Sequence, residues 1–168
     1  MKLPFLSAAI KVFRLDEGDG PKNKPGKPYR DSKGYWTIGR GHYIGPYLHD
    51  LTLPEPVIEA LFQYDLSIAI RDARFVLGDE TYDKLVPARQ LAIVSLAFNM
   101  GRSKLSKFTE TIDAIRKENW GRVADLLLKT KWARDVDPNH QPDMGRDDRI
   151  AYMFRTGLFH PDYKVNEL

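Results

Sequence analysis

The chain has 168 residues, of which 42% are hydrophobic and 29% charged, and it contains no cysteine. A chain of this length supports one hydrophobic core, so we expect a single domain spanning residues 1–168. The absence of cysteine excludes a disulfide framework, thiolate metal sites and thiol nucleophiles. The four histidines show no metal-ligand spacing, so we expect no metal site and no cofactor.

The net charge of +3 is unevenly distributed, because residues 1–50 hold nine Lys and Arg against five Asp and Glu. This excess is compatible with a polyanionic partner, such as an envelope polymer or a nucleic acid. An ordinary solvated surface explains it equally well. The first apolar run, broken by Lys11 and Arg14, is too short to span a membrane and has no secretory cleavage pattern.

The first third of the chain predicts one helix, a loop and a small β structure. Apolar residues recur at intervals of three and four over residues 4–17, which predicts an amphipathic helix that stops at Gly18. Residues 18–28 contain three prolines, three glycines and three lysines and predict a solvated loop. Residues 29–44 are aromatic and β-branched around a turn at 31–34, which predicts a hairpin or a three-stranded ribbon.

The remaining chain predicts helices only. Thr52 and Glu55 have the spacing of a capping box, and the helix that they begin should end near Leu77. Residues 88–100 are apolar nearly all round, which is typical of a buried core helix. Further helices are predicted over about 108–118, 120–130 and 146–155, with a loop between Pro138 and Pro142. We therefore predict an α+β fold that is predominantly helical.

Three residues form a candidate hydrolytic site. Glu17 lies at the C-terminal end of the first predicted helix, where the helix dipole opposes ionisation and favours a carboxyl that holds its proton. Asp31 and Thr37 flank the predicted turn, so a carboxylate and a hydroxyl could hold a water at one cleft. Inverting glycosidases need such an acid and such a water. Taken singly, each residue also has an ordinary structural explanation. Glu17 could be a surface charge at a helix end, Asp31 a turn former and Thr37 a strand residue.

Together these residues belong to a longer motif. Asp16-Glu17-Gly18 and the segment from Tyr29 to His42 match, at every fixed position, the pattern Asp-Glu-Gly followed by Tyr-x-Asp-x-x-Gly-Tyr-x-Thr-Ile-Gly-x-Gly-His. In this the chain resembles the phage-type lysozymes of glycoside hydrolase family 24. The resemblance continues in the family's order through Leu61-Phe62, Asp65, residues 97–101, Phe108-Thr109, Lys131-Trp132 and residues 154–157.

The resemblance implies a two-lobed lysozyme-like fold with a peptidoglycan cleft between the lobes. A small β-hairpin lobe would comprise about residues 18–52, and a larger helical lobe would comprise residues 1–17 and 53–168. Glu17 would be the catalytic acid, while Asp31 and Thr37 would stabilise charge and position the water.

The resemblance also implies roles for residues around this site. His42 would form a structural salt bridge with Asp65, Arg146 would lie against Glu17, and Arg149 against Asp16. A guanidinium beside Glu17 favours the ionised carboxylate, against the effect of burial, and the sequence leaves that balance open. The expected substrate contacts are Tyr43, Phe98, Asn99 and Thr111. Without the resemblance, Phe98 reads as a core residue and Thr111 as a helix-surface residue.

Two departures from the family's T-even phage member affect the expected cleft. Thirteen residues, 18–30, separate Glu17 from Asp31, which is a longer connection than in that enzyme, and the stretch between His42 and Asp65 is shorter. We expect a trimmed small lobe there. Our hypothesis is that Lys22, Lys24 and Lys27 compensate by contacting anionic wall or envelope groups.

The implied function is that of an endolysin, a bacteriolytic and antimicrobial muramidase that hydrolyses peptidoglycan for host lysis. It would act as a monomer without nucleic acid. We expect synthesis in the host cytoplasm without a signal peptide. Action on the periplasmic wall would follow release by a separate hole-forming protein or carriage in a virion. A lytic transglycosylase is the nearest alternative, although it needs no water held by Asp31 and Thr37. The second alternative is a non-catalytic basic module that binds the wall or nucleic acid.

Overall fold

The computed structural model describes residues 3–17, 27–45, 52–138 and 145–165. The elements in chain order are α1 (Leu3–Glu17), β1 (Tyr29–Arg30), β2 (Trp36–Ile38), β3 (His42–Tyr43), α2 (Glu55–Leu77), α3 (Asp79–Lys84), α4 (Pro87–Leu105), α5 (Thr109–Arg116), α6 (Trp120–Leu128), α7 (Lys131–Val136), α8 (Arg146–Thr156) and the 3-10 helix η1 (Pro161–Tyr163). The predicted α+β class, with helices predominating, is confirmed.

The sheet is antiparallel with the strand order β1-β2-β3, the three-stranded form of the predicted ribbon. Thr37 pairs with Tyr29 on one side and with Tyr43 on the other. The β1–β2 connection closes through a hydrogen bond from the Gly34 amide to the Asp31 carbonyl, 2.9 Å. Gly39, in the next turn, has a φ of 60°. A side chain there would collide with Ile58 of α2, so this glycine lets the sheet approach the helix.

The core is centred on α4, whose residues 91–97 are all buried. This confirms the buried helix predicted from the apolar run. The helix is interrupted at Gly101, which has a φ of 73° and a ψ of 161°, and the chain then resumes helical geometry to Leu105. Helix α4 packs against α2 and α8, and α6 packs against α8.

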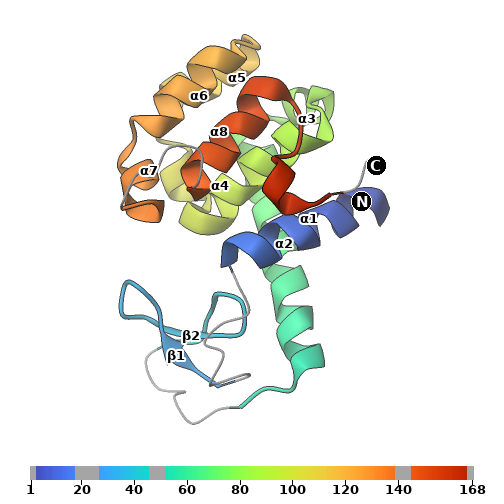
Figure 1. Cartoon of the computed structure of the whole chain (residues 1–168), viewed down its shortest axis with the longest axis vertical. Coiled ribbons are helices and arrows are strands. Elements are labelled where there is room, and N and C mark those ends of the chain that lie inside the picture. The colour runs from blue at the N-terminus through green and yellow to red at the C-terminus, as the bar shows by residue number, and fades with distance from the viewer. Residues whose placement is uncertain (1–2, 18–26, 46–51, 139–144, 166–168) are drawn as a thin grey trace.

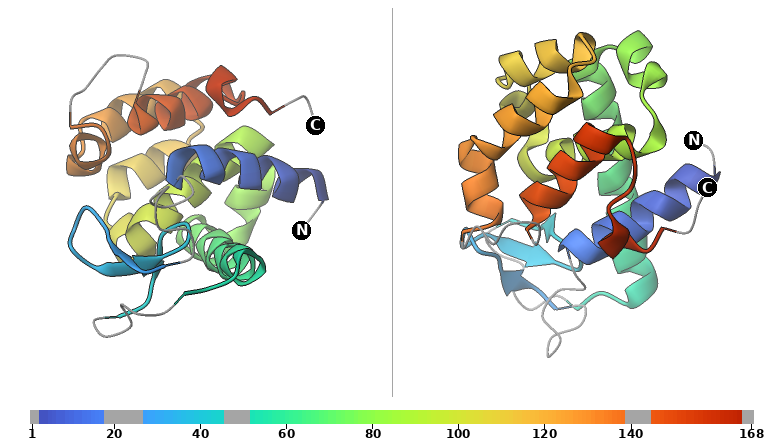
Figure 2. Two further views of the ribbon diagram at one scale, coloured as in Figure 1. Left: turned by 60° about the horizontal axis from the view of Figure 1, so that its bottom comes forward. Right: turned by 45° about the horizontal axis from the view of Figure 1, so that its top comes forward.

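Figure 1 shows the sheet at one end of the molecule and helices α4 to α8 at the other. Helix α2 runs from the sheet into the helical body, and α1 crosses it. In the right-hand view of Figure 2 the sheet lies beyond the ends of α7 and α8. Among the helices that the structure describes, none combines the length and the apolar character that crossing a membrane requires.

Some sequence predictions were wrong or fall outside the described chain. Thr52 does not cap α2, because the helix begins at Glu55 and Pro54 occupies the N-cap without a side-chain hydrogen bond. Leu53 precedes that proline, which disfavours the helical backbone that a cap at Thr52 needs. The short helices α3 and α7 were not predicted. The predicted loops lie largely within residues 18–26 and 139–144, which are outside the described residues.

Candidate active site

Asp31 and Thr37 face each other across the first turn of the sheet. Asp31 Oδ1 accepts hydrogen bonds from the backbone amides of Lys33 and Tyr35, both at 2.9 Å. Asp31 Oδ2 lies 3.5 Å from the Thr37 hydroxyl, which is also 3.3 Å from the Tyr35 carbonyl. The two amides therefore fix the carboxylate, and its second oxygen is directed towards Thr37. Thr37 itself is 3% exposed.

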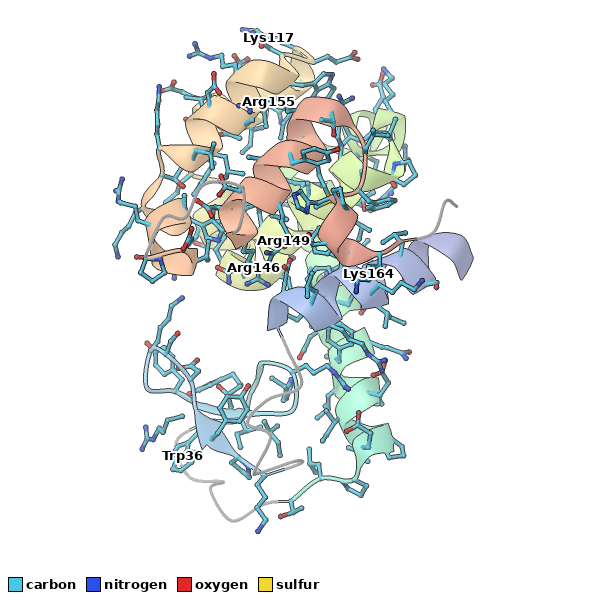
Figure 3. The ribbon with its side chains drawn as sticks, viewed as in Figure 1. Trp36, Lys117, Arg146, Arg149, Arg155 and Lys164 are labelled. Atoms are coloured by element: carbon cyan, nitrogen blue, oxygen red, sulfur yellow. The ribbon has the colours of Figure 1, made fainter. Side chains whose placement is uncertain are left out.

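Glu17 is the last residue of α1, and its side chain lies outside the described atoms. Its neighbour Asp16 has a fully buried side chain that Arg149 contacts at 2.9 Å and Arg146 at 3.4 Å. Figure 3 shows both arginines at the end of α8 that lies closest to α1. Both guanidinium groups therefore lie beside the end of α1 that carries Glu17.

A cleft of about 1090 Å³ lies between the β1–β2 turn and the helical body. It reaches Asp16 at the end of α1 and Arg146 and Arg149 at the start of α8. Ser32 and Lys33 border it from the turn. Asp31 and Thr37 do not themselves line it, although Asp31 directly precedes Ser32. The cleft thus joins the end of the helix that carries Glu17 to the turn that carries Asp31.

Two of the four predicted substrate contacts, Asn99 and Thr111, line this larger cleft. Asn99 Oδ1 accepts a hydrogen bond from the Trp132 indole at 3.0 Å, which orients the amide. Thr111 is 4% exposed, so it is a buried residue of the cleft wall rather than a helix-surface residue.

The other two, Tyr43 and Phe98, line a second cavity of about 300 Å³ between β3, α2 and α4. Phe98 packs on Phe13 with a ring-centroid distance of 4.7 Å, whereas Tyr43 is exposed. The same cavity contains His42 and Asp65, whose Nδ1 and Oδ2 atoms lie 2.7 Å apart. This pair links the sheet to α2.

The sequence profile of the phage lysozyme family matches residues 24–141. The chain belongs to the phage lysozyme family. It is 30% identical to "Probable T4-type lysozyme 2" of Dictyostelium discoideum over 95% of this chain and all of that protein. It is 28% identical to "Probable T4-type lysozyme 1" of the same organism over 93% of this chain and 98% of that protein.

A third relative is a much longer protein. The chain is 25% identical to "Pre-baseplate central spike protein Gp5" of Enterobacteria phage T4 over 92% of its own length, but only 28% of that protein is covered. Membership of the phage lysozyme family makes this chain a glycoside hydrolase of the lysozyme type.

The lysozyme fold also brings together groups that sequence reasoning missed. The Tyr163 hydroxyl lies 3.1 Å from Asp16 Oδ2, although 147 positions separate the two residues. No local pattern signals such a contact. Trp132 lies in a segment that matches the family's sequence pattern, but its hydrogen bond to Asn99 is visible only in the structure.

Three carboxylates of this lysozyme gather where α7 and α8 approach each other. Oxygen atoms of Asp137, Asp147 and Asp148 lie within 4.8 Å of one another, the spacing that a metal ion would require. Asp147 is fully buried. Burial, followed by the charge of Asp148 and then that of Asp137, raises the pKa of Asp147 despite opposing backbone hydrogen bonds. The mutual repulsion of these carboxylates is therefore reduced when a proton is bound.

Proposed function

We propose that this lysozyme hydrolyses the β-1,4 bond between N-acetylmuramic acid and N-acetylglucosamine in bacterial peptidoglycan, with inversion at the anomeric carbon. Glu17 is the general acid, and Asp31 and Thr37 hold the attacking water. The observation that carries this proposal is the Asp31–Thr37 pair, with its carboxylate fixed by two backbone amides and a hydroxyl 3.5 Å away.

The proposed reaction uses the two sides of the cleft in different roles. Glu17, at the end of α1, donates its proton to the glycosidic oxygen as the bond breaks. Asp31 stabilises the positive charge that develops on the sugar ring. A water that hydrogen-bonds to both Asp31 Oδ2 and the Thr37 hydroxyl attacks the opposite face of the anomeric carbon and loses its proton to Asp31. The positive charges of Arg146 and Arg149, close to the end of α1, stabilise the Glu17 carboxylate left after proton transfer.

The substrate contacts of the proposed complex lie along both cavities. Asn99 and Thr111 contact glycan in the larger cleft, and Tyr43 and Phe98 contact it in the smaller one. These side chains combine polar groups, which can hydrogen-bond to sugar hydroxyls, with aromatic rings, on which a sugar ring can pack. The functional unit is one domain with a β lobe of about residues 18–52 and a helical lobe formed by the remainder.

The proposed setting is lysis of a bacterial host by a monomeric enzyme. The protein is made in the host cytoplasm and reaches the periplasmic wall through a separate hole-forming protein or as part of a virion. The names of two relatives as T4-type lysozymes support a wall-cutting role, and the phage spike protein among the relatives is compatible with carriage in a virion. A thin Gram-negative wall is the favoured target.

Analysis of the digestion products tests this reaction. Mass spectrometry of muropeptides should find hydrated reducing ends, and NMR taken during the first turnovers should find the α anomer. Products with 1,6-anhydro ends would instead identify a lytic transglycosylase, in which the sugar's own hydroxyl displaces the leaving group. An initial β anomer would contradict inversion and leave hydrolysis standing.

A further inference from the structure

The larger cleft receives positive charge from both of its sides. Lys33 lies on the β1–β2 turn, and Lys104 and Lys107 lie at and just beyond the end of α4. All three side chains are exposed. In the part of the chain that the structure describes, the lysines that pair with carboxylates are Lys84, Lys117 and Lys131, and none of the three cleft lysines is among them.

The carboxylates that line the same cleft lie against groups other than these three lysines. Asp16 is held by Arg149, Glu110 lies 3.3 Å from Arg122, and Asp135 lies 3.6 Å from Lys131. The fourth, Asp137, belongs to the cluster with Asp147 and Asp148. None of these carboxylates pairs with Lys33, Lys104 or Lys107, and we call these three lysines the lysine rim.

Like charges that converge on one cleft repel each other unless an anion lies between them. Protein walls of low dielectric constant concentrate the field of such charges within the cleft, so an anion is drawn there. Because Lys33 comes from the β lobe whereas Lys104 and Lys107 come from the helical body, an anion contacted by both sides would also favour closure of the cleft around it.

The chemistry of the proposed substrate supplies a matching anion. The N-acetylated sugars of the glycan are uncharged, whereas the stem peptides attached to muramic acid carry free carboxylates. Asn99 and Thr111, the glycan contacts proposed above, line the same cleft as the lysine rim. A stem peptide on a glycan bound there would therefore share this cleft with the lysine rim.

We infer that the lysine rim, formed by Lys33, Lys104 and Lys107, is a subsite for the stem-peptide carboxylates of peptidoglycan. This inference rests on the proposed function and adds a substrate preference to it. The enzyme discriminates between wall material whose stem carboxylates are free and wall material in which they are amidated. Three partly solvated ion pairs together produce a preference of about tenfold.

The test compares two substrates with two triple variants of the full chain. One substrate is purified peptidoglycan with native stem peptides, and the other is the same material with its carboxylates converted to methylamides. The rim variant carries Lys33→Gln, Lys104→Gln and Lys107→Gln. The control variant carries Lys11→Gln, Lys129→Gln and Lys164→Gln, which remove the same charge from exposed residues outside the cleft. Circular dichroism verifies that both variants are folded.

The rim variant should cleave native peptidoglycan with a kcat/KM about tenfold below that of the wild type, and amidation should slow it no further. Amidation should slow the wild type and the control variant by that same factor. Two results would overturn the subsite while leaving the hydrolase intact. In one, the kcat/KM of the rim variant falls below that of the wild type by the same factor on both substrates. In the other, the rim and control variants lose the same factor in kcat/KM on native peptidoglycan. A wild type inactive on both substrates would contradict the proposed function itself.

Discussion

The hydroxyl of Tyr163 lies 3.1 Å from Oδ2 of Asp16, so the last helical turn of the described chain contacts the residue that precedes Glu17. Tyr163 is buried, and burial together with the nearby Asp16 charge raises its pKa well above the ordinary tyrosine value. The phenol therefore keeps its proton, and can donate a hydrogen bond, at neutral pH and above it. In Figure 3, the adjoining Lys164 lies beside α1.

Tyr163→Phe removes this donor while leaving the ring in place. We expect the free energy of unfolding to fall by about 1–2 kcal/mol, because a buried charged acceptor loses a partner. Urea denaturation measures the change. Tyr64→Phe, at an exposed position of α2, is the matched control and should leave the midpoint unchanged. Equal midpoints for the two variants would show that the contact contributes nothing.

Thr37→Val tests the water-holding role of the hydroxyl. Valine has nearly the same shape but offers no hydrogen bond, so we expect kcat on purified peptidoglycan to fall about a hundredfold. Thr37→Ser retains the hydroxyl and should lose much less. A valine variant as active as the serine variant would argue against a water bound between Asp31 and Thr37.

Glu59 should contribute stability that disappears in acid. Burial raises the pKa of Glu59. Hydrogen bonds from Gln63 and Arg14 and the charges of Arg14 and Arg40 lower this pKa by a larger amount, so the net shift is downward. A carboxyl with a lowered pKa in the folded state stabilises the protein above the ordinary glutamate pKa and loses that contribution as the pH falls through the folded value.

Glu59→Gln should therefore be less stable than the wild type near neutral pH, by about 1 kcal/mol, and the two should converge as the pH falls below about 4. Denaturation curves recorded at several pH values provide the measurement. Glu80→Gln, which breaks an exposed pair with Lys84, should give a smaller difference. A Glu59→Gln deficit that persists in acid would mean that ionisation of Glu59 is irrelevant to it.

Asp147 should show the opposite pH dependence. Its pKa is raised by burial and by Asp148 and Asp137, so the folded state binds its proton more tightly than the unfolded state does. Stability then falls as the pH rises from the ordinary aspartate pKa through the raised value. Asp147→Asn should be more stable than the wild type at neutral pH, and this advantage should shrink in acid. Loss of stability at neutral pH would contradict this account.

The long helices could be predicted because their burial patterns are periodic over many turns. Residues 88–100 are apolar on nearly all sides and form the buried part of α4. Helices α3 and α7 have six residues each, which is less than two turns, so no period is visible in them. The capping box at Thr52 failed because spacing alone ignores the backbone restriction that Pro54 places on Leu53.

The candidate site was predictable where its residues are close in sequence. Asp31 and Thr37 lie six positions apart on one hairpin, so the predicted turn was enough to bring them together. The lysine rim and the Tyr163–Asp16 contact join distant segments, which only the packing of the helices against the sheet makes adjacent. The sequence carries no local signal for either.

The most direct test of the proposed reaction is the rate of peptidoglycan cleavage by Glu17→Gln. Glutamine retains the shape of glutamate but has no acidic proton to donate, so kcat should fall about a thousandfold or more. Binding to insoluble peptidoglycan and the unfolding midpoint should stay near the wild-type values, which separates lost chemistry from lost structure. A Glu17→Gln variant that binds, folds and cleaves within about tenfold of the wild-type rate would contradict the assignment of Glu17 as the catalytic acid.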